Sequence, residues 1–129
     1  MEKLEQAVEL AFKRGDGNGS DEKIMRRTLM LCARNKGLLV GDDFVAAWFR
    51  YNPDIGDSVA AMDFSELGQY NLTEGKIMHI AYLTAPKGKG SRLIRKIINL
   101  HNPWGVSAFF KTRDGNVFHS KINPNWRSG

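Results

Sequence analysis

The chain has 129 residues, which by size predicts a single domain over residues 1–129 with enough chain to bury a core. It is 42% hydrophobic and 26% charged, with 13 Gly and only 4 Pro, which excludes a disordered tail or a fibre. Its charge is uneven: residues 1–86 carry 10 basic and 13 acidic side chains, whereas residues 87–129 carry 9 basic and 1 acidic. We therefore expect any anionic partner to bind to the last third of the chain.

In the first half of the chain, apolar residues at helical spacing predict two helices. One covers residues 2–13 and ends at GDGNGS, and the second runs from Ser20 as N-cap to Gly37 as its stop. The apolar period then changes to two, which predicts a β-hairpin of LLV and FVAAWFRY around residues 41–43. Residues 52–75 show no clean period, so we expect a long irregular excursion over the surface or a cleft.

In the second half, residues 76–85 (KIMHIAYLTA) form the strongest predicted strand, with apolar residues on both faces. Alternation along it places His79 on one face, and Tyr82 on the other. The segment PKGKGS follows, and then RLIRKIINLH has helical spacing. Two short strands, VSAFFKT and NVFHSKI, are predicted around a turn at residues 113–116.

The loop between the strong strand and this helix has the residues of a phosphate site. Pro86 ends the strand, Gly88 and Gly90 permit the turn, and Ser91 is the expected helix cap. The first N–H groups of a helix point at a bound anion, together with the positive end of the helix dipole. Further positive charge comes from Lys87, Lys89 and Arg92. The segment lacks the Lys-Ser/Thr pair of a P-loop and the third glycine of a Rossmann fingerprint. It predicts phosphate or pyrophosphate binding, with a plain surface turn as the alternative.

This loop resembles the pyrophosphate-binding motif of the GNAT acyltransferase family, written (Gln/Arg)-x-x-Gly-x-(Gly/Ala). Ala85-Pro86-Lys87-Gly88-Lys89-Gly90 has the same glycine spacing, with Ala85 at the Gln or Arg position. The order of predicted elements is also similar over most of the chain. The resemblance implies an α/β (α+β) fold in which a mostly antiparallel sheet, splayed at its central strand, is flanked by helices.

The resemblance also implies an activity, the transfer of an acetyl or other acyl group to an amine or lysine acceptor by direct attack. The donor would be acetyl-CoA or another acyl-coenzyme A, or an acyl carrier protein, and the chemistry needs no metal. The donor-binding residues that the resemblance implies are Leu83, Thr84, Ala85, Lys87, Gly88, Lys89, Gly90, Ser91 and Arg92.

A narrower resemblance is to the toxin-activating lysine acyltransferases, through Phe44-Val45-Ala46-Ala47-Trp48 and Leu83-Thr84-Ala85-Pro86. Those enzymes use a histidine in the N-terminal region and an aspartate on the central strand. Here no histidine precedes His79, and Tyr82 stands near the aspartate position. This departure implies that their mechanism is not retained. Compact variants of the fold also resemble phage proteins.

Two side chains on the central strand are candidates for catalysis. The GNAT resemblance implies a general base on the central strand, for which His79 is the candidate, and a core histidine with a satisfied hydrogen bond is the alternative. The resemblance also implies a tyrosine that protonates the leaving thiolate; Tyr82, closer to the loop, is the candidate, with packing as the alternative.

Other chemistry-bearing residues point more weakly to function. Asp63 and Glu66 could attract an amine substrate, or act as turn and cap residues. Cys32 stands in an apolar helical context and is predicted to be a buried, inert thiol. His101 and His119 have no metal-ligand spacing, so no metal site is expected.

The basic last third also suggests a function of another class, nucleic-acid binding, because its cations are interleaved with aromatic residues. A third reading is a catalytically silent structural protein, for example of a phage assembly, on the same fold. With one cysteine, no apolar signal core in MEKLEQAVELAFKRG and no long apolar run, the chain is expected to be cytoplasmic, in the host cytoplasm if phage-encoded, and to have no membrane partner.

Overall fold

A computed structural model of the protein describes residues 2–13, 22–86, 88–111 and 117–121. The helices are α1 (Glu2–Lys13), α2 (Glu22–Arg34), η1 (Pro53–Ile55), α3 (Gly56–Ala61), α4 (Phe64–Leu67) and α5 (Gly90–His101). The strands are β1 (Leu38–Val40), β2 (Val45–Tyr51), β3 (Ile77–Thr84), β4 (Gly105–Lys111) and β5 (Val117–Lys121).

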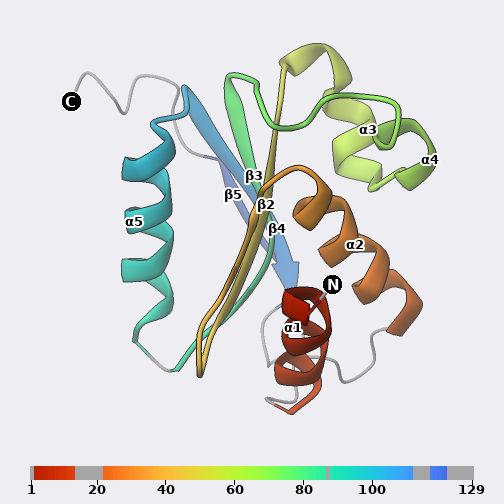
Figure 1. Ribbon diagram of the computed structural model, residues 1–129. Coiled ribbons are helices and arrows are strands. Elements are labelled where there is room, and N and C mark those ends of the chain that lie inside the picture. The colour runs from red at the N-terminus through yellow and green to blue at the C-terminus, as the bar shows by residue number, and fades with distance from the viewer. Residues whose placement is uncertain (1, 14–21, 87, 112–116, 122–129) are drawn as a thin grey trace.

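The described strands form one mixed sheet in the order β1-β2-β3-β4-β5. Three of its pairings are antiparallel, and β3 with β4 is parallel. Figure 1 shows the sheet between two helical layers, with α5 on one face and α1 to α4 on the other. The expectation of a mixed α/β protein with a mostly antiparallel sheet and flanking helices is therefore confirmed.

Alternation along β2 divides the core in two. Val45, Ala47 and Phe49 are buried against α1 and α2, whereas Ala46 and Trp48 are buried against α5. Because successive strand side chains point to opposite faces, a strand with apolar residues at every position can build a core on both sides.

A β-bulge in the centre of the sheet changes the faces predicted for β3. Ala47 pairs with Tyr82 and the next residue, Trp48, pairs with Ile80, so Ala81 is an extra residue on β3. Tyr82 consequently packs on the same face as Ala81, and Leu83 packs on the α5 face. The predicted alternation was right up to Ala81 and wrong from Tyr82 onward, because one inserted residue reverses every following side chain.

Residues 52–75 were expected to be irregular, and this was wrong. They contain η1, α3 and α4, and they bury Val59, Leu67 and Leu72 in the core on the α2 side of the sheet. Helices of three to six residues are too short to show a helical period in sequence.

Gly37 was expected to stop the second helix, but α2 ends earlier, at Arg34, and Lys36 takes the left-handed conformation with φ 59°. The Gly37 N–H still helps to end the helix by donating to the Cys32 carbonyl at 2.7 Å, and the glycine also has a second role. A Cβ at Gly37 would lie 1.7 Å from the carbonyl oxygen of Trp48, and the Trp48 N–H donates to the Gly37 carbonyl at 2.8 Å. The chain therefore needs a glycine here to pass close to β2.

None of the described helices has both the length and the apolar character needed to cross a membrane.

Candidate functional site

Of the two glycines expected to permit the turn between β3 and α5, Gly88 does so, whereas Gly90 is already the first residue of α5. The Lys89 N–H donates to the Pro86 carbonyl at 3.0 Å, and Gly88 lies between them with φ +85°, a left-handed conformation that glycine adopts without strain. α5 begins at Gly90, and its N-cap is Lys89, which provides no side-chain cap. The prediction of Ser91 as cap was wrong, because Ser91 is already the second residue of the helix.

An uncapped helix start suits an anion. The first backbone N–H groups of any α-helix have no intrahelical acceptor, and here the N-cap side chain does not supply one. The free N–H groups are those of Gly90, Ser91 and Arg92, and they lie at the end of the helix where its dipole is positive.

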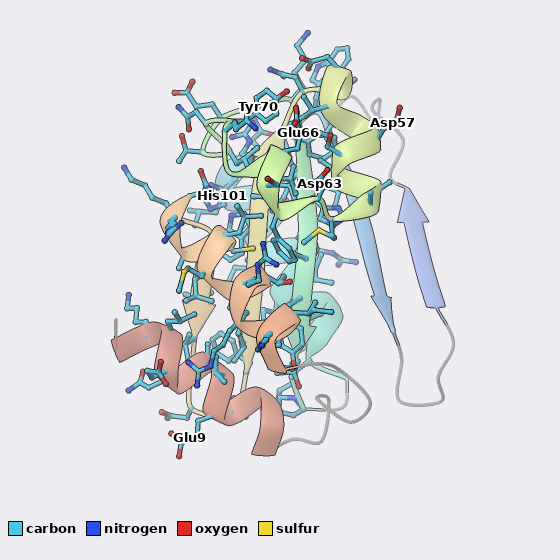
Figure 2. All side chains as sticks on the ribbon, turned by 90° about the vertical axis from the view of Figure 1, so that its right-hand side faces the viewer. Glu9, Asp57, Asp63, Glu66, Tyr70 and His101 are labelled. Carbon is cyan, nitrogen blue, oxygen red and sulfur yellow. The ribbon has the colours of Figure 1, made fainter. Side chains whose placement is uncertain are left out.

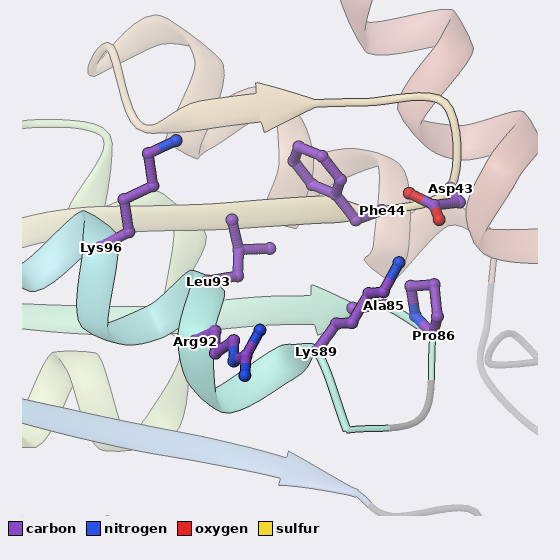
Figure 3. Close-up of a pocket in the computed structure, with 8 residues that line it drawn as sticks. All are labelled: Asp43, Phe44, Ala85, Pro86, Lys89, Arg92, Leu93 and Lys96. Atoms are coloured by element: carbon purple, nitrogen blue, oxygen red, sulfur yellow. The ribbon is translucent and has the colours of Figure 1, made fainter.

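Beside this helix start is a pocket of about 250 Å³, shown in Figure 3. Three cations of α5 and its cap line the pocket: Lys89, Arg92 and Lys96. They are spaced three and four residues apart and therefore share one face of the helix. None of the three forms an ion pair with a residue that the structure describes. Arg95 is exposed on the same helix but does not line the pocket, and Lys87 lies outside the described residues.

The rest of the pocket is built from two other segments. Ala85 and Pro86 follow directly after β3, and Asp43 and Phe44 come from the bend of the β1–β2 hairpin. The hairpin reaches this place because Val45 pairs with Thr84. A Cβ on Gly41 would lie 2.1 Å from the Phe44 ring, so the bend packs directly on the ring.

The expected donor residues at the end of β3 and just after it have different surroundings. Leu83 faces α5, with its Cδ2 3.5 Å from the position of a Cβ on Gly90. Thr84 is buried and Ala85 lines the pocket. In the described chain, the parallel pairing with β4 runs only from Ile77 to Ile80, whereas β3 continues to Thr84.

His79 is buried on the opposite face of the sheet, 5% exposed, and is part of a polar group in the core. Its Nδ1 lies 2.8 Å from Ser107 Oγ, and the Tyr51 hydroxyl lies 3.1 Å from the same oxygen. Its ring is 5.1 Å from the Phe49 ring. The three polar side chains come from three adjacent strands, so His79 has the satisfied hydrogen bond of the core alternative.

Tyr82 is half-buried and lines a second, smaller cavity of about 130 Å³ between α2 and β3. The other walls of this cavity are Ile24, Met25, Thr28, Leu29 and Ala81. Because of the bulge, Tyr82 and His79 share the α2 face, which the sequence did not predict.

Asp63 and Glu66 have local structural roles, which was the alternative to attracting an amine substrate: Asp63 caps α4, and Glu66 accepts a hydrogen bond from Tyr70. The Glu66 N–H donates to Asp63 Oδ1 at 3.2 Å at the start of α4, and the Tyr70 hydroxyl donates to Glu66 Oε1 at 3.0 Å. This last hydrogen bond raises the pKa of Tyr70. Figure 2 shows these residues together with Asp57 at the end of the molecule formed by α3 and α4.

The remaining candidates lie apart from the pocket. Cys32 is buried in the α2 core, and burial raises the pKa of its thiol. Burial, and then the charge of Arg50, lower the pKa of His101 at the end of α5. Within the described residues, no three His, Cys, Asp or Glu side chains are grouped as around a metal ion. The side chain of His119 lies outside the described residues.

The donor-binding residues expected from the sequence did not include Asp43, Phe44, Leu93 or Lys96, which line the pocket, and Ser107 was not expected as the partner of His79. The signal for the first two was present, since antiparallel pairing of the strands at residues 44–51 and 76–85 brings the hairpin bend to the loop. The contact between Ser107 and His79 depends on β4 being the strand beside β3, and no local sequence pattern predicts that pairing.

Comparison of the chain with family models, with curated proteins and with solved structures gives no significant match.

Proposed function

We propose that the protein is an N-acyltransferase with a GNAT-like fold, which binds acetyl-CoA or another acyl thioester at the loop between β3 and α5. The observation that carries the proposal is the pocket beside the start of α5, where Lys89, Arg92 and Lys96 stand next to a left-handed Gly88. A tight glycine turn, uncapped N–H groups and clustered cations are the features that favour a phosphate group at a helix start.

The order of elements supports the donor half of the proposal. Two helices, a hairpin, the long β3, the glycine loop with α5 and then β4 follow one another as the GNAT resemblance implies. Beyond Ile80 the described chain has no pairing of β3 with β4, so the edge of residues 81–84 that faces away from β2 can accept the pantetheine arm as an added strand. The bulge at Ala81 lies where this edge begins.

In the proposed reaction, the neutral acceptor amine attacks the thioester carbon, the N–C bond forms and the C–S bond breaks. The proton lost by the amine passes to a base, and the leaving thiolate takes a proton from an acid. Tyr82 is assigned the acid role, since it lies on β3 nearer to the loop. For His79 the base role competes with the structural role that its Ser107 contact supports.

Two variants separate these roles. His79 is buried against Ser107, so His79→Gln is expected to lower stability by about 1–3 kcal/mol in either case. If His79 is the base, the folded variant also loses most of its kcat and the part of the pH profile that the base provides. If it is only structural, the kcat of the folded variant stays nearly unchanged. Tyr82→Phe is expected to lower the rate of thiol release from acetyl-CoA with a lysine peptide as acceptor, without weakening acetyl-CoA binding.

Calorimetry with acetyl-CoA tests the donor site directly. Gly90→Asp should abolish binding by charge repulsion, while the fold is kept, because the Gly90 Cβ position makes only an ordinary 3.5 Å contact and a carboxylate is favourable in a first helical turn. Gly56→Asp is the matched control, since Gly56 also begins a helix and has open space around its Cβ position. No binding to the folded parent protein at millimolar acetyl-CoA, or unchanged binding in Gly90→Asp, contradicts the proposal.

A second candidate function, nucleic-acid binding, is favoured by one observation. Arg92, Arg95 and Lys96 are all exposed on α5, and Trp104, just beyond the helix, is 54% exposed. The cation over the Trp104 ring is Lys76, with its Nζ 5.2 Å from the ring centroid. Exposed cations together with an exposed aromatic ring suit a single strand. Affinity for an oligonucleotide should then fall steeply with salt, and a salt-independent affinity would argue against this function.

A further inference from the structure

The charged side chains on the outer side of α5 are all positive. Arg95 and Lys96 follow three and four residues after Arg92 and are exposed with it on one side of the helix, and α5 contains no Asp or Glu. The sheet contacts the other side of α5 through buried isoleucines, and in the described segments no helix or strand lies against the outer side (Figure 1). Leu100, four residues after Lys96, extends this row. We call Arg92, Arg95, Lys96 and Leu100 the α5 face.

Negative charge is collected at another place, the end of the molecule formed by η1, α3 and α4. Residues 51–75 contain five carboxylates and no Lys or Arg. Four of the five stand in or beside these short helices, and we call them the acidic end: Asp54, Asp57, Asp63 and Glu66. Arg27 of α2 borders the acidic end, with its guanidinium 4.5 Å from the centre of the Phe64 ring. One cation does not balance four carboxylates, so this end is negative (Figure 2).

Each of the two charged surfaces also presents one large, exposed side chain. Leu100 is 78% exposed on the α5 face, and Tyr70 is 40% exposed at the acidic end. The Tyr70 hydroxyl donates to Glu66 Oε1 at 3.0 Å. This hydrogen bond, the charge of Glu66, and then burial and the charge of Asp54 raise the pKa of Tyr70, so carboxylates lie around this ring. Contacts between proteins commonly have such an apolar or aromatic centre inside a charged rim.

The arrangement of the two surfaces decides what each can contact. They cannot reach each other within one molecule, because the sheet lies between α5 and the layer that contains α3 and α4 (Figure 1). Two α5 faces repel each other, and so do two acidic ends, since each carries charge of one sign. The α5 face of one copy and the acidic end of another attract. A second copy of the chain therefore has the charge that each surface requires.

We infer that the chain self-associates head to tail, with the α5 face of one copy against the acidic end of the next. The cations of the α5 face pair with the carboxylates, and Leu100 packs on the exposed ring of Tyr70. Because each copy uses two different surfaces, the contact is heterologous and builds rings or longer chains rather than a symmetric dimer. The inference goes beyond the proposed acyltransferase function and does not depend on it.

Sedimentation velocity of the full chain over a range of concentrations tests the contact. The parent protein should form species larger than a monomer as its concentration rises. An increase from about 50 to 500 mM NaCl should weaken this association, because salt screens exposed charges. Arg95→Glu and Asp54→Lys should each weaken it about tenfold or more, because each puts like charges into the contact.

Two matched controls locate the effect. Lys3→Glu makes the same charge reversal as Arg95→Glu at an exposed position of α1, and it should leave the association unchanged. Leu100→Ser should weaken the association, whereas Leu39→Ser, at an exposed position of β1 outside both surfaces, should not. All of these side chains are exposed, so the variants are expected to fold, which circular dichroism checks.

A mixture of two variants gives the sharpest result. The Asp54→Lys variant keeps an unchanged α5 face, and the Arg95→Glu variant keeps an unchanged acidic end. An equimolar mixture should therefore form pairs that neither variant forms alone, as a head-to-tail contact requires.

Several outcomes overturn the inference. These are a parent protein that stays monomeric at low salt, equal losses in Arg95→Glu and Lys3→Glu, or a mixture that forms no pairs. A monomeric parent whose binding to a labelled oligonucleotide is lost in Arg95→Glu also overturns it, and assigns the α5 face to nucleic acid. Calorimetry with acetyl-CoA tests the proposed function separately, because Arg95 does not line the pocket. A self-associating parent that binds no acetyl-CoA contradicts the proposed function alone.

Discussion

Replacing Gly88 or Gly90 by alanine is expected to have opposite effects on stability. Gly88 has φ +85° and no heavy atom within 4 Å of its Cβ position, so an alanine there meets no obstacle but must occupy the left-handed region. That conformation costs an L-residue about 1–2 kcal/mol. Gly90 is the first residue of α5, and its Cβ would make only an ordinary contact at 3.5 Å with Leu83 Cδ2. Alanine favours a helix over glycine by ~0.5–1 kcal/mol.

Gly88→Ala is therefore expected to weaken acetyl-CoA binding about 5- to 30-fold, because ligand binding must restore the strained turn at a cost of ~1–2 kcal/mol. Gly90→Ala should leave binding within about twofold and make the protein slightly more stable. Calorimetry gives the two affinities, and urea denaturation gives the two unfolding free energies. Equal behaviour of the two variants in both measurements would refute the reasoning, since it would mean that the left-handed turn matters neither to the fold nor to the ligand.

Three other predictions concern the fold. Gly37→Ala should destabilise the protein by about 1–3 kcal/mol or more in urea denaturation, because its Cβ would overlap the Trp48 carbonyl oxygen, whereas Gly56→Ala, with open space, should not; equal effects would contradict the close approach. The buried Cys32 thiol, whose pKa burial raises, should react with a disulfide reagent only at the rate of unfolding, and rapid labelling of the folded protein would contradict its burial. His101 has a folded-state pKa below its ordinary 6.5, so the unfolded chain takes up this proton first and stability is lost as the pH falls from about 6.5 through the folded-state pKa. His101→Gln should flatten that part of the stability curve, and an unchanged curve would show that another group titrates.

Much of the local structure followed from sequence pattern. α1 covers the predicted residues 2–13, the predicted hairpin is β1–β2, and the glycine loop leads into α5, which begins two residues before the predicted helical segment. These features depend on neighbours within a few positions of the chain, where periodicity and glycine placement act directly. The short helices in residues 52–75 did not follow, because each is shorter than the window in which a period can be seen.

The position of the bulge was not predictable from β3 alone. An alternating apolar strand has the same pattern with or without an extra residue, and the register with β2 decides where Ala81 falls. That one residue determines that Tyr82 lies on the α2 face with His79 and that Leu83 lies beside α5.

The sequence by itself determined the uneven charge, with nine of the cations in residues 87–129, and the glycine loop that follows the strongest strand. Only the tertiary structure decided that Lys89, Arg92 and Lys96 share one pocket and that Arg95 does not line it. It also brought Asp43 and Phe44 to that pocket and Ser107 to His79. The physical reason is that composition and turn chemistry are local properties, whereas the walls of a site are set by strand register and helix packing between distant segments.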